Sequence, residues 1–170
     1  MKTASTLLGL MLAAPLPAAL ASNGTVSING QVEPCTCVIN DGNKDITLTL
    51  PTLSASTLAK AGATAGDTKF TIKLSGCATN RAVYFFEAGP NIDLTNNILA
   101  NIAGTGRAKN VGIQLLNGAG QPVKLGALES GVEGPLPGVL YVDLYARYYA
   151  TGVATSGPVK GFTSFSIQYL

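Results

Sequence analysis

The 170-residue chain contains 11 Lys and Arg, 9 Asp and Glu and no His, which gives a formal net charge of +2 at pH 7. The missing imidazole excludes histidine-based catalytic triads and removes the commonest metal ligand. The sequence also shows no basic patch that would attract nucleic acid or anionic lipid. We therefore expect no enzymatic activity, no catalytic or metal site, no cofactor and no small-molecule substrate.

The first 21 residues have the composition of a secretory signal peptide. Lys2 precedes an apolar run at residues 7–12, and small residues at 19 and 21 come just before a suitable cleavage point. The run is shorter than the roughly 20 residues that a membrane-spanning helix requires. We expect residues 1–21 to be removed and the remainder to form one domain.

Directly after this leader, residues 24–32 read GTVSINGQV. In an extended chain Val26, Ile28, Gly30 and Val32 fall on one face, because side chains alternate between faces with a period of two. The pattern predicts a short strand. No hairpin turn joins this strand to the next one, so the sheet to which it belongs is not evident from the pattern.

Further segments have the alternation or the β-branched and aromatic content of strands, and turn residues separate them. These predicted strands cover residues 46–50, 70–74, 82–87, 111–116, 139–150 and 162–170. Residues 53–63 and 94–103 each predict one short helical turn, because their glycines and asparagines disfavour more. Short strands at this spacing predict an antiparallel β-sandwich.

The chain contains three cysteines, Cys35, Cys37 and Cys77. A disulfide is the default in an exported protein. Cys35 and Cys37 are two residues apart and share one face of a strand, so only one of them can pair with Cys77. The residues by themselves leave both pairings open.

The predicted strand at 162–170 places Phe165, Ile167 and Tyr169 on one face. An apolar strand at the edge of a sheet is an aggregation hazard that proteins normally cover. The alternating strand at 26–32 is a candidate for that cover.

Taken together, these features resemble the pilins of the chaperone–usher pathway, and within them the major subunits of type 1 fimbriae. The resemblance extends over the whole mature chain. It is carried by V-x-I-x-G-x-V at 26–32, Cys37 with Val38 and Ile39, Cys77, the segments 61–64, 110–114 and 146–152, Gly157 and Tyr169.

The resemblance implies an all-β, incomplete immunoglobulin-like β-sandwich that lacks its last strand and is completed by a donor strand from a neighbouring subunit. Residues 22–33 would form the N-terminal donor-strand extension, and residues 34–170 the pilin domain. Within the extension, the side chains of Val26, Ile28 and Val32 would fill pockets, and Gly30 would match a shallow one. The acceptor groove, which also binds the chaperone, would include Gly157, Phe165, Ile167, Tyr169 and Leu170.

The same resemblance implies a structural fimbrial subunit that polymerises by donor-strand exchange into a surface fimbria mediating cell adhesion. Its partners would be identical subunits, a periplasmic chaperone and an outer-membrane usher, met during export through the periplasm to the cell surface. The family spacing favours a Cys37–Cys77 disulfide, with Cys35–Cys77 as the alternative. The alternative functions are a minor or tip-associated fimbrial subunit and a secreted carbohydrate-binding β-sandwich.

Overall fold

The computed structural model describes residues 37–129, 131–134 and 138–170. The expected leader at 1–21, the predicted strand at 26–32 and Cys35 lie outside the described residues. All described residues belong to the unit Pro34–Leu170.

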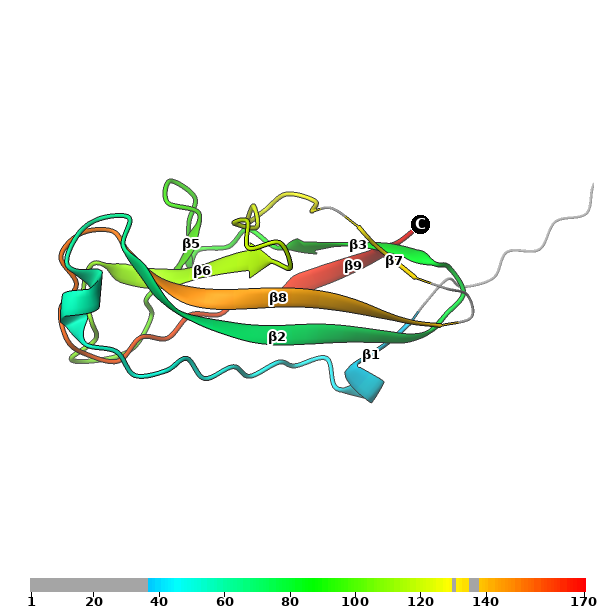
Figure 1. The fold of residues 1–170 in the computed structure, drawn as a ribbon, viewed down its shortest axis with the longest axis horizontal. Coiled ribbons are helices and arrows are strands. Elements are labelled where there is room, and N and C mark those ends of the chain that lie inside the picture. The colour runs from blue at the N-terminus through cyan, green and yellow to red at the C-terminus, as the bar shows by residue number, and fades with distance from the viewer. Residues whose placement is uncertain (1–36, 130, 135–137) are drawn as a thin grey trace, which may run out of the picture. The chain divides into compact units, whose positions relative to one another are not determined.

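The larger sheet is built around two long antiparallel strands, β2 (Thr64–Cys77) and β8 (Gly138–Ala150), which lie side by side over most of their length (Figure 1). Their alternating sequences bury Ile72, Leu74 and Leu144 on the inner face, where none of these side chains is exposed to solvent. The strand order is β1-β2-β8-β6-β5-β4. The remaining strands are β1 (Val38–Ile39), β4 (Ile92–Asp93), β5 (Ile98–Ala100) and β6 (Val111–Asn117).

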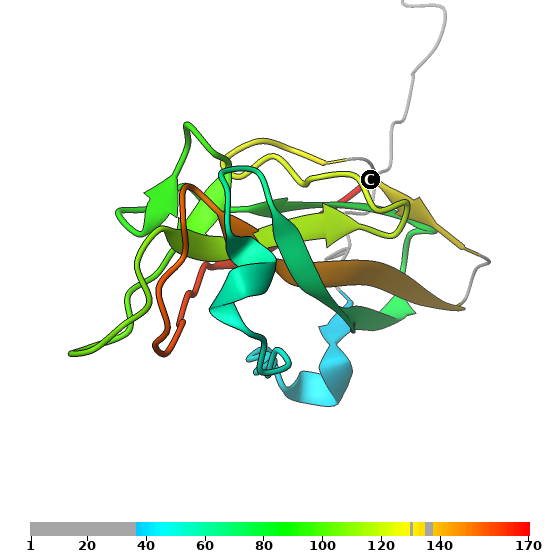
Figure 2. The same ribbon diagram turned by 60° about the vertical axis from the view of Figure 1, so that its left-hand side comes forward.

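The smaller sheet has the order β7-β3-β9. It consists of β3 (Arg81–Phe86), β7 (Val132–Glu133) and β9 (Phe165–Tyr169). Tyr84 and Phe86 of β3 join Leu74 and Leu140 of the larger sheet in one apolar core. The two sheets therefore form the two layers of a β-sandwich with the core between them, as Figure 2 shows from the side.

Two short 3-10 helices interrupt the strands, η1 (Asn40–Gly42) and η2 (Ala55–Leu58). The η2 helix confirms the predicted helical turn within residues 53–63. Leu58 at its end joins a second, smaller apolar cluster with Val111 and Ala150. This cluster fixes one end of the sandwich, where loops from three parts of the chain meet.

Most of the predicted strands are confirmed. Residues 70–74 lie within β2, 82–87 correspond to β3, 111–116 to β6 and 139–150 to β8. The last strand is shorter than predicted, because the ladder with β3 begins only at Phe165.

The predicted helical turn at 94–103 is wrong. Asp93 accepts hydrogen bonds from the backbone amides of Thr95 (3.0 Å) and Asn96 (3.1 Å), which closes a tight turn between β4 and β5. The chain then pairs as a strand at 98–100. The Asp and Asn residues locally favour a turn, and the pairing of residues 98–100 with β4 and β6 makes the following segment a strand.

Residues 46–50 also differ from the prediction, because they join no strand ladder among the described residues. Ile46, Leu48 and Leu50 nevertheless pack against the core, while Thr47 and Thr49 are exposed. The segment thus has the alternation of a strand and lacks a hydrogen-bonded neighbour. Figure 1 shows it as a long trace running beside β2.

Candidate functional site: an apolar groove between two unpaired backbone edges

A groove of about 580 Å³ lies between the unpaired segment 44–50 and residues 161–165, which lead into β9. Ile46, Leu48 and Leu50 form the first wall, because alternate side chains of this segment point inward. Phe162 and Phe165 line the second wall. The groove therefore has one strand-like segment on each side.

The floor of the groove comes from the core of the sandwich. It contains Phe70 of β2, Ile113 and Leu115 of β6, and Ala146 of β8, together with Phe86 and Leu99. Phe86 and Phe165 lie with their ring centroids 6.3 Å apart and tilted by 56°. A strand laid in this groove would bury apolar side chains, and burial of apolar surface contributes roughly 25 cal/mol per Å².

The hydrogen bonds of β9 show which of its backbone groups are free. The amide of Glu87 donates to the carbonyl oxygen of Ser164 (2.9 Å), and the amide of Leu170 donates to that of Arg81 (3.0 Å). In an antiparallel ladder the residues that bond to one neighbour alternate with residues that bond to the other. Ser164, Ser166, Gln168 and Leu170 therefore face β3.

The intervening residues Phe165, Ile167 and Tyr169 direct their backbone amides and carbonyls to the opposite edge. In the part of the chain that the structure describes, β9 pairs with β3 alone. Unpaired edges of this kind are templates for the addition of a strand. The groove thus has an apolar floor, and β9, which continues from its second wall, carries a row of backbone groups with no strand partner among the described residues.

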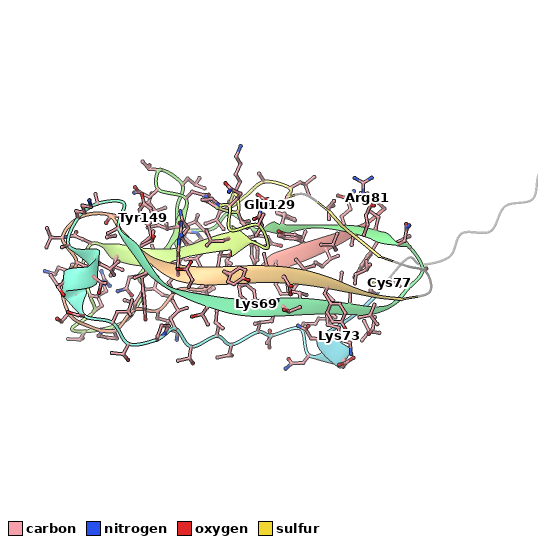
Figure 3. The ribbon with its side chains drawn as sticks, in the orientation of Figure 1. Lys69, Lys73, Cys77, Arg81, Glu129 and Tyr149 are labelled. Atoms are coloured by element: carbon pink, nitrogen blue, oxygen red, sulfur yellow. A yellow bond between two sulfur atoms is a disulfide. The ribbon has the colours of Figure 1, made fainter. Side chains whose placement is uncertain are left out.

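The charged groups lie mostly away from this floor. Lys69 Nζ is 2.8 Å from Asp143 Oδ2, and this hydrogen bond raises the pKa of Lys69 and lowers the pKa of Asp143. Lys73 pairs similarly with Asp41 at 2.9 Å, which raises the pKa of Lys73. Figure 3 shows Lys69 and Lys73 along β2. Within residues 37–129, 131–134 and 138–170, no three His, Cys, Asp or Glu residues lie close enough together to hold a metal ion.

The structure brings only some of the predicted groove residues together. Phe165 lines the groove directly. Ile167 and Tyr169 continue the same strand and pack against the core, and Leu170 is half exposed. Their contacts with a chaperone or a donor strand stay predictions.

Gly157 lies outside this groove. It lines a second hollow of about 350 Å³ with Leu58 and Pro158. A side chain at this position would collide with the neighbouring loop, because its Cβ would lie 2.5 Å from the amide nitrogen of Ala108. Close approach of two backbones therefore accounts for a glycine here.

The disulfide joins Cys37 to Cys77, with a sequence separation of 40 residues and a Cα–Cα distance of 4.4 Å. This confirms the favoured pairing over the Cys35–Cys77 alternative. The bridge ties the start of β1 to the end of β2, shortly before the segment that forms the first wall of the groove.

Several residues of the groove were not predicted from the sequence, chiefly those of its floor and first wall. Phe70, Ile113 and Leu48 have the pattern of ordinary core residues, and nothing local distinguishes a core position covered by the protein's own chain from one left open. The alternation at 46–50 was the one available signal. It indicated a strand, and only the fold shows that the segment has no strand neighbour among the described residues.

The described residues form an immunoglobulin-like sandwich with an apolar groove beside an edge of β9 that has no strand partner among them, a geometry that suits the addition of a strand. Solved structures have the same fold. The crystal structure of the P pilus rod subunit PapA aligns with a TM-score of 0.62 at 21% identity, over 79% of this chain and 99% of that one. A subunit of a chaperone–usher pilus aligns with a TM-score of 0.63 at 21% identity, over 93% and 100%.

Sequence comparison gives the family. The family described as "Fimbrial protein" matches residues 26–170. The chain is 38% identical to the major fimbrial subunit SMF-1 of Stenotrophomonas maltophilia, over 94% of this chain and 99% of the relative. It is 40% identical to the F17 fimbrial protein of Escherichia coli, over 96% of each. The chain therefore belongs to the fimbrial protein family: it is a structural subunit of fimbriae, exported to the cell surface.

Proposed function

We propose that the groove accepts the N-terminal extension of a neighbouring copy of this chain, so that subunits polymerise by donor-strand exchange into a surface fimbria that mediates cell adhesion. The observation that carries this proposal is the apolar groove. Among the described residues, it is bordered on one side by a segment that joins no strand ladder and on the other by residues leading into β9, whose edge facing away from β3 has no strand partner. An added strand would supply main-chain hydrogen bonds and side chains for the floor together.

The sequence of the extension suits this groove. Residues 26–32 have the same number of positions as the first wall, residues 44–50, so at roughly 3.3 Å per residue the two extended segments have equal length. Val26, Ile28 and Val32 present apolar side chains on one face to an apolar floor. Gly30, on the same face, suits a place where the floor leaves no room for a side chain.

Before polymerisation the groove requires another cover, because an open apolar edge favours aggregation. A periplasmic chaperone that lends a strand to Phe165, Ile167 and Tyr169 would supply it, and an outer-membrane usher would be the place of exchange. Residues 1–21 would direct export, residues 22–33 would be the extension, and residues 34–170 the pilin domain that accepts a strand.

The test changes the extension and leaves the acceptor domain intact. In a strain whose fimbriae are built from this subunit, we expect deletion of residues 22–33 to abolish surface filaments in electron micrographs. The truncated subunit should still copurify with the chaperone, because its groove is unchanged. Filaments that form normally from the truncated subunit would contradict donor-strand exchange.

A pair of point variants separates the inward face of the extension from its outward face. Ile28→Asp places a charge against an apolar floor, where an unpaired charge is costly, so filaments should be lost. Ser27→Asp adds the same charge on the opposite face and should leave filaments intact. Equal loss of filaments in both variants would show that filament formation does not depend on which face of the extension points into the groove.

A further inference from the structure

Folding separates charges that are nearly balanced in the sequence. Several cations form ion pairs with carboxylates, namely Lys69, Lys73, Arg81 and Arg147. Others are exposed and form no ion pair within the described residues, among them Lys60, Arg107, Lys109 and Lys160. The second set lies in loops 55–63, 101–110 and 151–161, which contain no Asp or Glu.

Hydrogen bonds hold these loops together as one surface. The amide of Lys109 donates to Thr155 Oγ1 (2.8 Å), and the amide of Thr155 donates to the carbonyl of Lys109 (3.2 Å). The amide of Lys160 donates to Asn101 Oδ1 (3.0 Å), and Ala154 bonds to Leu58. We call this surface, formed by the three loops, the basic end. Figure 1 shows it at the end of the sandwich that carries η2.

Among the described residues, none of the four cations of the basic end forms an ion pair, and its three loops contain no Asp or Glu. Charges of one sign that are not neutralised locally produce a positive potential, which attracts polyanions. Exposed hydroxyl groups lie among them: Ser54, Thr155 and Ser156 line the hollow of about 350 Å³ beside Gly157. Cations with neighbouring hydroxyl groups are suited to a ligand that carries both anionic groups and hydroxyls.

We propose that the basic end binds acidic polysaccharide, meaning a glycan chain that carries sulfate or carboxylate groups. The loops contain no aromatic residue, and single-stranded nucleic acids are bound largely by stacking of bases on aromatic rings. The loops also lack the row of large apolar side chains with which a protein segment inserts into a membrane. The position of the protein on fimbriae at the cell surface brings the site into contact with glycans.

A fimbria repeats this surface once per subunit. Each contact with an exposed cation is weak, but a polysaccharide that spans several subunits binds them together, and its avidity exceeds the affinity of one site. The inference rests on the fimbrial class of the protein and requires that the basic end remains exposed in the assembled fimbria.

The experiment uses intact purified fimbriae and beads that carry dextran sulfate, carboxymethyl-dextran or neutral dextran. Wild-type fimbriae should be retained on both acidic beads at about 50 mM salt, pass through neutral beads, and elute at about 500 mM, where the screening length falls to a few ångströms. Lack of retention on the acidic beads, or retention that survives high salt, would overturn the proposal without reference to any variant.

Two charge-matched double variants locate the site. Arg107→Gln with Lys109→Gln should weaken retention about fivefold, since each exposed contact is worth only a fraction of a kcal/mol to about one. Lys73→Gln with Lys124→Gln removes the same charge away from both the basic end and the groove, and should change retention less than twofold. Equal weakening by the two pairs would show attraction to net charge alone and would refute a site at the basic end. If the first pair yields no filaments, Lys60→Gln alone replaces it, with about a twofold expected loss.

Discussion

The disulfide gives the sharpest stability prediction, because the structure fixes which loop it closes. Cys37 and Cys77 are separated by 40 residues, and closing a loop of this length should stabilise the fold by about 4 kcal/mol on the chain-entropy model. Cys77→Ala removes the bridge whichever cysteine is its partner. Alanine is the suitable replacement because Cys77 is buried, with 5% of its surface exposed. A serine would also bury a hydroxyl group without a partner, which would lower the stability further.

The assay is urea unfolding of the oxidised, leaderless chain followed by circular dichroism. With a slope of roughly 2 kcal/mol per M, the loss of about 4 kcal/mol lowers the unfolding midpoint by about 2 M. Wild type treated with a reductant should unfold at the same midpoint as Cys77→Ala.

The matched control is Cys35→Ala. It leaves the Cys37–Cys77 bridge in place and should retain the wild-type midpoint and a bridged peptide in mass spectrometry. A midpoint of Cys35→Ala as low as that of Cys77→Ala, or a wild-type midpoint for Cys77→Ala, would refute a stabilising Cys37–Cys77 bridge.

Three further predictions concern the core and its charges. Leu144→Ala, at a site with 0% exposure, should lower the free energy of unfolding by roughly 2–5 kcal/mol in the same assay, whereas Leu128→Ala, at a site with 63% exposure, should change it little. The hydrogen bond from Lys69 lowers the pKa of Asp143 in the folded protein. The ionised Asp143 therefore stabilises the fold at pH values above the ordinary carboxyl pKa, and this stabilisation is lost as the pH falls through the lowered pKa. The difference in urea midpoint between wild type and Asp143→Asn should therefore shrink in acid. Burial, with a contribution from Glu129, raises the pKa of Tyr84 to about 12. The neutral Tyr84 therefore stabilises the fold fully below about pH 10, and this stabilisation is lost as the pH rises toward 12. An ultraviolet titration should show a late tyrosinate step that is absent in Tyr84→Phe, and early ionisation of Tyr84 would contradict its burial.

Local pattern was sufficient to predict most of the strands. Residues 139–150 alternate with a period of two, and residues 111–116 are rich in large apolar and β-branched side chains; they form β8 and β6 with nearly the predicted bounds. Alternation predicts strands well because a half-buried strand must present one apolar face. The turn at 94–97 was mistaken for helix because Asn and Asp residues favour several local conformations, and the pairing of β5 with β6 selected one of them.

The pairing of the cysteines was open from the residues and favoured only by resemblance. From the sequence alone, Cys35 and Cys37 would share one face of an extended strand, so either could be the partner of Cys77. The register of β1 against β2, with Val38 opposite Ser75, brings Cys37 to Cys77. A register is a relation between two segments, and it is not contained in the sequence of either one.

The groove is likewise a product of the tertiary structure. The alternation at 46–50 predicts apolar contacts on one side, but it cannot tell whether a neighbouring strand pairs with the backbone. The same limit applies to the charges, since the composition is nearly neutral and only the folded loops place Lys109 and Lys160 on one carboxylate-free surface. The sequence by itself determined the strands, the apolar faces and the family resemblance, because these depend on neighbours along the chain. The tertiary structure decided the disulfide, the open groove and the basic end, because each depends on segments that meet only when the chain folds.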